Sequence, residues 1–471
     1  MKTKKKRIPI MKKQSIVMMT LALALLVAPA VMAQSVGFQD GNGNDNEAVA
    51  SQTGNNNTVD IDQDETKNDV ESSQISSGGD NNLQVQQLGT NAGLLLEQNA
   101  GTGNNSAIVN QGQAGQINNW ASVTQNASIG NTLTIDQVGN NNSVTSVDDN
   151  GFVEANGRAF QSSQGSTVQS NTLNVDQTGD DNQVGIFQEA TNDNIADVIQ
   201  DGNANVLGVR QSSTSPSTSN TLNSNQFGEN NKANLIQTTG GTNDATINQN
   251  GDNNRFAGTD ANGSFAGSVA ARQTTANGDI DLDLNQEGNN NRFGLTQEGK
   301  GGGDQNGVQI DQLGDNNRGS VRMISNGDND LNARFLQDGN DNFAAINMVG
   351  GTNVLHVNQS GDRNEIRGAN SSGGFDANSN ANILGTANNR LNFVQNGNDN
   401  QIGLYSETDS GHVRGNVGNL GFDQQGDFNL AGVYQTNTAG NNLIYVSQTG
   451  LDVANIAQVS NGGLNTINVT Q

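Results

Sequence analysis

The chain has 471 residues, of which 32% are hydrophobic, and its formal charge at pH 7 is −25. So little apolar surface excludes a thick globular core, and with this charge it would normally indicate disorder, because burial could not offset chain entropy. The acidic balance also excludes nucleic acid as a partner for the surface as a whole, and the absence of cysteine excludes a disulfide framework.

Residues 1–33 have the pattern of a secretory signal peptide. A basic stretch, MKTKKKRIPIMKK, precedes an apolar run, SIVMMTLALALLVAPA, and small side chains at Val31 and Ala33 precede Gln34. The apolar run is too short and wrongly flanked for a membrane span. Cleavage removes seven of the 22 Lys and Arg and no acid, so the mature chain carries 15 − 47 = −32 charges.

From residue 52 to residue 471 one pattern recurs, QxGxxNxxxxxQ, as in QTGDDNQVGIFQ from Gln177. A shorter arm, such as NTLTIDQ from Asn131, lies between copies, and its last Gln is the first Gln of the next copy. About fifteen units, mostly 22 to 26 residues apart, begin at Gln52, Gln87, Gln111, Gln137, Gln177, Gln200, Gln226, Gln249, Gln286, Gln312, Gln337, Gln359, Gln395, Gln424 and Gln448. A spacing this regular indicates a repeat architecture.

Each arm alternates with period two, for example Asn182, Val184, Ile186 and Gln188, which predicts a strand with these four side chains on one face. The Gly with neighbouring Asn and Asp predicts a corner. We therefore expect an all-β fold, a parallel in-register β-solenoid with two strands per coil and about fifteen stacked coils. Polymerisation would convert it into a cross-β, amyloid fibre.

An inward amide without a partner would cost about 1–3 kcal/mol. If the same amide recurs one coil above and one coil below, each NH₂ can donate to the next carbonyl, as in cross-β stacks. The residues expected to form these ladders and corners are Gln52, Gly54, Asn57, Gln63, Gln137, Gly139, Asn142, Gln177, Gly179, Asn182, Gln188, Gln200, Gly202, Asn205, Gln211, Gln226, Gly228, Asn231, Gln237, Gln286, Gly288, Asn291, Gln297, Gln312, Gly314, Asn317, Gln424, Gly426, Asn429, Gln435, Asn442 and Gln448.

These arms strongly resemble curlin repeats, the building blocks of curli subunits, over about residues 52–471. The resemblance implies a secreted structural subunit of a Gram-negative bacterium that forms extracellular amyloid fibres of the biofilm matrix and supports adhesion and cell aggregation. It also implies an outer-membrane secretion pore, a nucleator subunit and periplasmic chaperones as partners. Residues 34–51 would then be the segment that addresses the chain to the pore. Familiar curli subunits have about five repeats, so this chain resembles an enlarged relative.

Four intervals between units are long, and we expect their extra residues in corner insertions near 64–80, 149–170, 259–279 and 369–388. Two interpretations stay open, because loops tolerate insertion at little entropic cost but could also bundle fibres or bind ligands. A run of cations, Lys232, Arg255, Arg292 and Arg318, follows the Asn in four successive units. Acids at Glu229, Asp252 and Asp315 are expected to relieve their stacking, with an anion-binding stripe as the alternative.

The end coils have free strand edges, which solenoids normally cover with polar caps. The last arm, NTINVTQ at residues 465–471, is followed by nothing, so we expect templated end-to-end polymerisation. The alternative is a monomeric, capped β-solenoid adhesin or ice-binding protein. We expect no enzyme, cofactor or metal site, because Cys is absent and both His, His356 and His412, read as surface residues.

Overall fold

The structure is a computed structural model. It describes residues 35–40, 45–150, 152–154, 157–163, 170–190, 192–213, 218–239, 242–257, 271–274, 283–299, 308–325, 332–344, 346–349, 354–369, 375–376, 381–384, 391–397, 399, 401–405, 412–414, 420–426, 430–437, 442–449, 453–460 and 465–470. The predicted signal peptide, residues 1–33, lies outside them.

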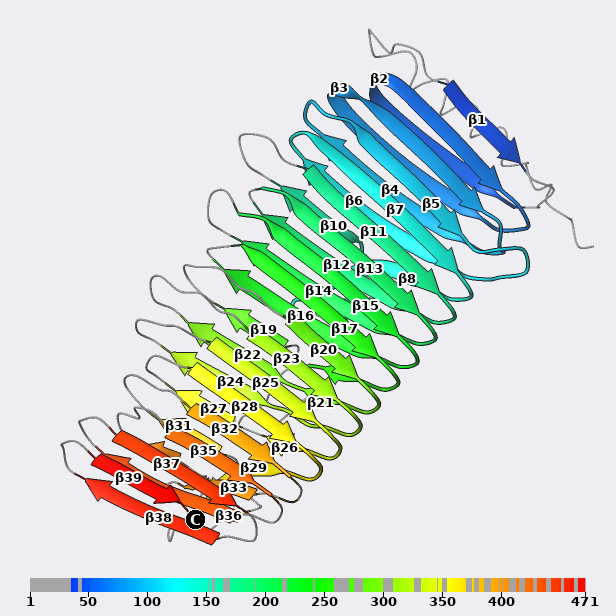
Figure 1. Ribbon diagram of the computed structural model, residues 1–471. Helices are drawn as coiled ribbons and strands as arrows, with labels where there is room; N and C mark the ends of the chain where they lie inside the picture. The colour runs from blue at the N-terminus through cyan, green and yellow to red at the C-terminus, as the bar shows by residue number, and fades with distance from the viewer. Residues whose placement is uncertain are drawn as a thin grey trace, which may run out of the picture.

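All regular elements of the described chain are β-strands, and they lie crosswise along one long axis in two facing stacks (Figure 1). The first stack holds β1 (Ser35–Asp40), the second halves of β2 (Glu47–Gln63) and β3 (Asp69–Gln87), β5 (Asn105–Gln111), β7 (Gly130–Val138), β11 (Ser170–Thr178), β13 (Asn194–Asp201), β15 (Asn220–Phe227), β17 (Asn243–Asn250), β20 (Asp283–Glu287), β23 (Val308–Leu313), β25 (Asn332–Asp338), β28 (Val354–Ser360), β32 (Leu391–Asn396), β35 (Leu420–Gln425), β37 (Asn442–Thr449) and β39 (Asn465–Thr470).

The second stack faces the first and holds the alternate arms. It contains the first halves of β2 and β3, β4 (Gly93–Ala100), β6 (Trp120–Ala127), β8 (Ser143–Val147), β10 (Ala159–Ser163), β12 (Gln183–Ala190), β14 (Val206–Ser213), β16 (Lys232–Thr239), β18 (Arg255–Phe256), β19 (Ala271–Thr274), β21 (Arg292–Phe293), β22 (Leu295–Gly299), β24 (Val321–Ser325), β26 (Phe343–Ala344), β27 (Ile346–Val349), β29 (Glu365–Ala369), β31 (Ala381–Leu384), β33 (Gln401–Tyr405), β34 (His412–Arg414), β36 (Leu430–Asn437) and β38 (Val453–Ser460).

Strands within each stack pair parallel and in register, so like residues lie over like residues. On β11 and β13, Leu173 lies beside Ala196, Val175 beside Val198, and Gln177 beside Gln200. Only β9 (Val153–Glu154) and β30 (Phe375–Asp376) pair antiparallel among the named strands, with β8 and β29. The predicted parallel, in-register β-solenoid is confirmed.

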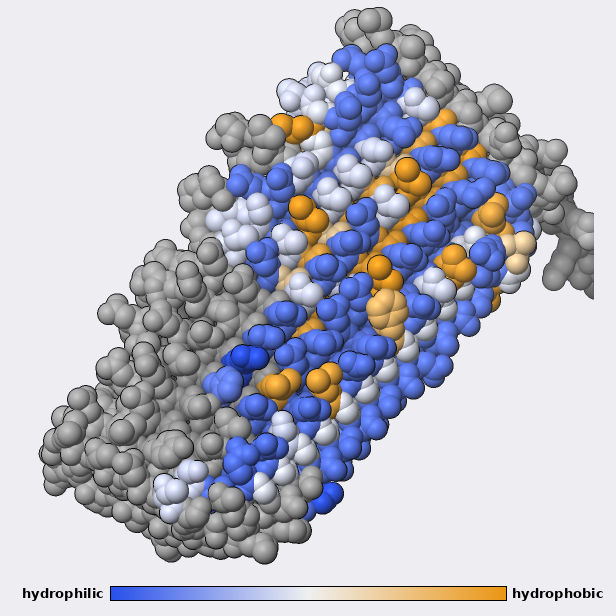
Figure 2. All heavy atoms as spheres, in the orientation of Figure 1, coloured by the Kyte–Doolittle hydropathy of each residue, from blue (hydrophilic) through white to orange (hydrophobic). Residues whose placement is uncertain are grey.

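The core is a thin layer between the two stacks. Side chains alternate strictly between buried and exposed along β13, as period two requires. Val175, Val198, Val184 and Ile186 are among the buried apolar residues, at 2% exposure or less. The outer face in Figure 2 is largely hydrophilic, with scattered apolar side chains, so each coil buries its few apolar residues inward.

The first coil is in a different register from the one predicted. Gln52 pairs with Gln74, whereas Gln63 pairs with Gln87 and heads the column of unit starts. Residues 69–76, expected within a corner insertion near 64–80, are regular strand and pair with β4. Strands also continue before residue 52, because β1 pairs with the second half of β2.

The second insertion interrupts an arm rather than a corner. Residues 143–145 pair with 183–185, and residues 160–163 pair with 187–190, so the segment between them leaves the stack midway along one strand. The third insertion also interrupts an arm of the second stack. Both β18 and β19 pair with β16, and residues 258–270 lie between them in the chain. The fourth insertion also falls within an arm, because β29 and β31 pair with β26 and β27, the two parts of one arm. The expected corner position is therefore wrong for these three insertions.

Candidate functional site

One column of glutamines runs along the inside of the first stack. Fifteen residues follow each other in register: Gln63, Gln87, Gln111, Gln137, Gln177, Gln200, Gln226, Gln249, Gln286, Gln312, Gln337, Gln359, Gln395, Gln424 and Gln448. From Gln63 to Gln359, each Nε2 donates to the Oε1 of the next Gln at 2.7–2.9 Å. Gln424 donates to Gln448 at 2.6 Å.

The remaining N–H of these amides is also used. Gln177 Nε2 donates to the carbonyl of Ser143 at 3.2 Å, and Gln200 Nε2 donates to the carbonyl of Gln183 at 3.1 Å. Both acceptors belong to the facing stack. The Gln side chains therefore bond successive coils to one another and the two stacks to each other, although both Gln177 and Gln200 are fully buried.

A second glutamine column runs along the inside of the second stack. It comprises Gln52, Gln74, Gln98, Gln125, Gln161, Gln188, Gln211 and Gln237, again with each Nε2 donating to the next Oε1. The backbone register continues it through Gln273 and Gln297 to Met323. The amide column thus gives way to methionine at Met323.

Sequence reasoning missed several members of this second column. Gln161 is the closing Gln of the unit that begins at Gln137, and it was missed because the insertion separates it from the first half of its arm. Gln74 was missed because the first coil was set half a coil out of register. Gln98 was missed because Ala92 stands at the Asn position of its unit, and Gln125 because the corner after Gln111 is three residues longer than in the template. The signal that could have found them is the Asn six residues before each of Gln74 and Gln125, as in the recognised arms.

The asparagines fall into two columns with different bonds. Asn57, Asn81, Asn105, Asn131, Asn171, Asn194, Asn220 and Asn243 form a side-chain ladder, in which each Nδ2 donates to the Oδ1 of the previous Asn at 2.7–3.0 Å. Seven of these residues, all except Asn57, had been noted only in the shorter arms or not at all. Gln donation runs toward the C-terminus, and donation in this Asn ladder runs toward the N-terminus.

The Asn that follows each Gly corner clasps the backbone of the next coil instead. Asn182 Oδ1 accepts the backbone N–H of Asn205 at 3.0 Å, and Asn182 Nδ2 donates to the carbonyl of Gly202 at 2.7 Å. The same pair of contacts is made by Asn142, Asn205, Asn231, Asn254, Asn291, Asn317 and Asn342. Asn364 Nδ2 likewise donates to the carbonyl of Gly397. The amide-to-amide ladder expected at Asn142, Asn182 and their equivalents is therefore an amide-to-backbone clasp.

The corner glycines have two reasons to be glycine. Gly179 has a φ of 106°, a conformation that L side chains rarely adopt. A Cβ on Gly179 would lie 2.1 Å from the carbonyl oxygen of Gly202 in the next coil, and the same holds for Gly202 against Gly228. Gly54, Gly139, Gly228, Gly288, Gly314 and Gly426 also have positive φ.

Some predicted residues are described only in part. Gln297, Gln435 and Asn442 lie on β22, β36 and β37, where the backbone pairs in register, and Asn429 lies outside the described residues. Among described residues there is no group of three metal-ligating side chains. In the same part of the chain, none of the elements is a helix that could span a membrane.

The strands at both ends of the described stacks have a neighbour on one side only. β1 pairs with β2 alone, β39 with β37 alone and β38 with β36 alone. At the first end of the second glutamine column, Gln52 Oε1 is buried and has no hydrogen-bond partner. These edges carry unpaired backbone groups that another strand can extend.

Residues 38–64, which run from β1 to the end of β2, match the family model of the Curlin associated repeat. No curated protein matches the chain. The chain therefore carries a curlin associated repeat, as the resemblance predicted. Its solenoid with Gln and Asn ladders is consistent with a curli-like subunit.

Proposed function

We propose that this chain, in which a curlin associated repeat begins a solenoid of stacked amide ladders, is a secreted structural subunit. It assembles by templated end-to-end addition into extracellular curli-like amyloid fibres of a biofilm matrix, and the fibres support adhesion and cell aggregation. A curli-type outer-membrane pore, a nucleator and periplasmic chaperones are its proposed partners, with residues 1–33 as signal peptide and 34–51 as the address for the pore. It is not an enzyme.

The observation that carries the proposal is the set of half-paired end strands. β1 and β39 lie at opposite ends of one in-register stack (Figure 1). A second copy placed end to end would continue the stack with the same parallel pairing, at a spacing of about 4.8 Å. It would also extend the glutamine columns, which supply a bond per coil.

Seeded growth of the purified chain from Gln34 onward tests the proposal. We expect fibres with a 4.8 Å meridional spacing whose growth is accelerated by preformed seed. Replacing Ile467 and Asn468 on β39 by Pro removes two backbone donors from the end strand and should slow elongation several-fold.

The matched control replaces the same positions by Val and Gln, which keep the backbone donors. Circular dichroism of each variant shows whether the solenoid still forms. A folded monomer that no seed can elongate would contradict the proposal and favour the capped adhesin or ice-binding alternative.

A further inference from the structure

Four cations stack on the outer face of the second stack, beside the Gly corners. This cation column consists of Lys232, Arg255, Arg292 and Arg318, all exposed and paired in register. Neighbouring strands lie about 4.8 Å apart, so like charges repeat at that spacing. Val206 precedes the column and Phe343 follows it.

The corner acids do not neutralise this column. Within the described residues no ion pair joins Glu229, Asp252 or Asp315 to it. Asp252 Oδ1 instead accepts the backbone N–H of Glu229 at 2.8 Å, and Asp315 Oδ1 accepts that of Asn289 at 2.7 Å. The expected local relief of charge is therefore wrong for the described chain.

Repulsion between the like charges of the column lowers the pKa of one of its members. Partial burial lowers the pKa of Arg292, and the neighbouring Arg318 and Arg255 lower it further. The described outward side chains of β16, β18, β19 and β21 include no acid. An anionic surface brought against this face would therefore meet positive charge alone on these strands.

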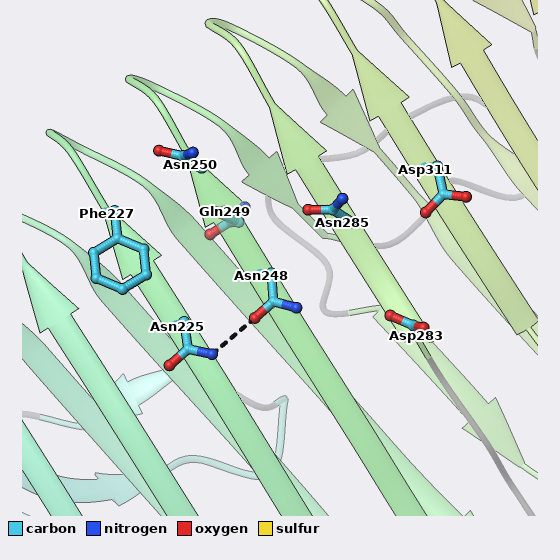
Figure 3. A pocket seen from close by; sticks show the side chains of 8 residues that line it. All are labelled: Asn225, Phe227, Asn248, Gln249, Asn250, Asp283, Asn285 and Asp311. Atoms are coloured by element: carbon cyan, nitrogen blue, oxygen red, sulfur yellow. Dashed lines mark hydrogen bonds between the residues drawn. The ribbon is translucent and has the colours of Figure 1, made fainter.

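The opposite face of the solenoid carries the complementary charge. A groove of about 410 Å³ lies on the first stack, lined by Asn225, Phe227, Asn248, Gln249, Asn250, Asp283, Asn285 and Asp311 (Figure 3). Asp283 and Asp311 come from the neighbouring strands β20 and β23, and burial together with Asp283 raises the pKa of Asp311. The strands of this stack from β2 to β23 contain no Lys or Arg. Arg334 on the next strand, β25, lowers the pKa of Asp311 by less than burial and Asp283 raise it.

Given the proposed fibre, on which this inference rests, we propose that solenoids also associate side by side, the cation column of one copy lying against the acidic groove of a second copy. The cation column repeats with the spacing of the strands, and Asp283 and Asp311 lie on adjacent strands, so two Arg side chains can pair with two carboxylates. The surface outside the cation column is strongly acidic and repels a second copy, so attraction between copies needs the cation column.

The two surfaces are different patches on opposite faces, so the contact is heterologous. Each copy that uses its cation column still presents its groove, and each that uses its groove still presents its column. Heterologous contacts that do not close generate open assemblies. The expected product is a bundle of parallel fibres rather than a closed pair.

The test compares two double variants of the purified full mature chain. Arg255→Gln with Arg292→Gln removes two charges from the cation column, and Lys67→Gln with Arg158→Gln removes two exposed cations outside both surfaces. We expect the first pair to reduce the fraction of bundled fibres several-fold in electron micrographs and low-speed sedimentation. The second pair should leave bundling unchanged.

Asp283→Asn with Asp311→Asn should reproduce the loss, with Glu47→Gln and Glu71→Gln as the acidic control. Wild-type bundles should separate in 1 M NaCl, where the Debye length is about 3 Å. Seeded elongation, measured in parallel, should be unaffected, which separates this inference from the proposed fibre. Bundling unchanged in both test variants, or bundles that form only after an anionic polymer is added, would overturn the inference.

Discussion

At the residue scale, a polar side chain can be buried in this solenoid because its bonding partner is a copy of itself. Gln177 and Gln200 are fully buried, yet their amides bond along the column and across to the facing stack. The asparagines solve the same problem in two ways, through a ladder at Asn194 and a backbone clasp at Asn182. Composition alone had pointed to disorder, and repetition of these bonds is what compensates for the small apolar core.

Replacing Gln200 by Leu should break the first glutamine column at one coil. It leaves Gln177 Nε2 without its acceptor and Gln226 Oε1 without its donor, and each unsatisfied buried group costs about 1–3 kcal/mol. The free energy of unfolding, measured with denaturant, should fall accordingly. Asn223→Leu, on an exposed position of β15, should change it little; equal effects would contradict the ladder.

Ala204 is poorly suited to the backbone conformation of its corner position. Its φ is 57°, and the equivalent positions hold Asp181 and Asn230 at 61° and 57°. A left-handed conformation costs an Ala about 1–2 kcal/mol, which Asn tolerates better. Ala204→Asn should therefore raise the free energy of unfolding by about 1 kcal/mol, whereas Ala204→Val should lower it.

At the scale of the strand, the arms, the corners and the pairing of like residues could be predicted from the sequence, since period two and the Gly corner leave little freedom. The register of the first coil could not, because Gln52, Gly54, Asn57 and Gln63 fit the pattern equally well half a coil away. In the structure, Gly54 has a φ of 153° and lies at the corner opposite to the one that Gly179 and its equivalents form.

The position of the second insertion could not be predicted from the repeat pattern either. Ser146 and Val147 prolong the alternation of β8, so the arm seemed intact, but they already belong to a hairpin with β9. That hairpin lies over the second stack. Arg158 pairs with Glu97 at 3.3 Å in one direction along the stack. In the other direction Asp149 pairs with Arg210, also at 3.3 Å.

Deleting residues 146–158 should be tolerated, because Thr145 and Ala159 occupy adjacent places in the strand column. The two lost ion pairs contribute only about 0–1 kcal/mol each. We expect the variant to fold and to elongate wild-type seeds. Deleting residues 171–183, a segment of equal length through β11, removes part of a coil and should abolish seeding; loss of seeding in both variants would contradict the mid-strand position.

At the scale of the whole molecule, stacking in register brings like charges together as readily as like amides. Asp136 lies beside Asp176 on neighbouring strands. Burial, Asp136 and Asp201 raise the pKa of Asp176, and burial, Glu47 and Glu71 raise that of Asp69. The acidic surface therefore works against the compact state near neutral pH.

Acidification should stabilise the solenoid. An acid whose pKa is raised on folding above its ordinary value of 3.8 destabilises the fold at neutral pH, and this penalty disappears as the pH falls through the raised pKa. The denaturation midpoint should rise between neutral pH and about pH 4. Asp176→Asn should flatten this rise, and Asp60→Asn on β2 serves as the control; a midpoint that falls over this range would contradict the prediction.

The one-way donation along each glutamine column gives the molecule a head and a tail. At the N-terminal end, Gln52 Oε1 is an acceptor without a donor. Along the described glutamine columns each Nε2 donates toward the C-terminal end, whereas in the Asn ladder each Nδ2 donates toward the N-terminal end. If the N-terminal ends of two copies met, amide oxygen would face amide oxygen, so copies have to add with the same orientation. A filament built from them would be polar: its two ends are chemically distinct and should elongate at different rates.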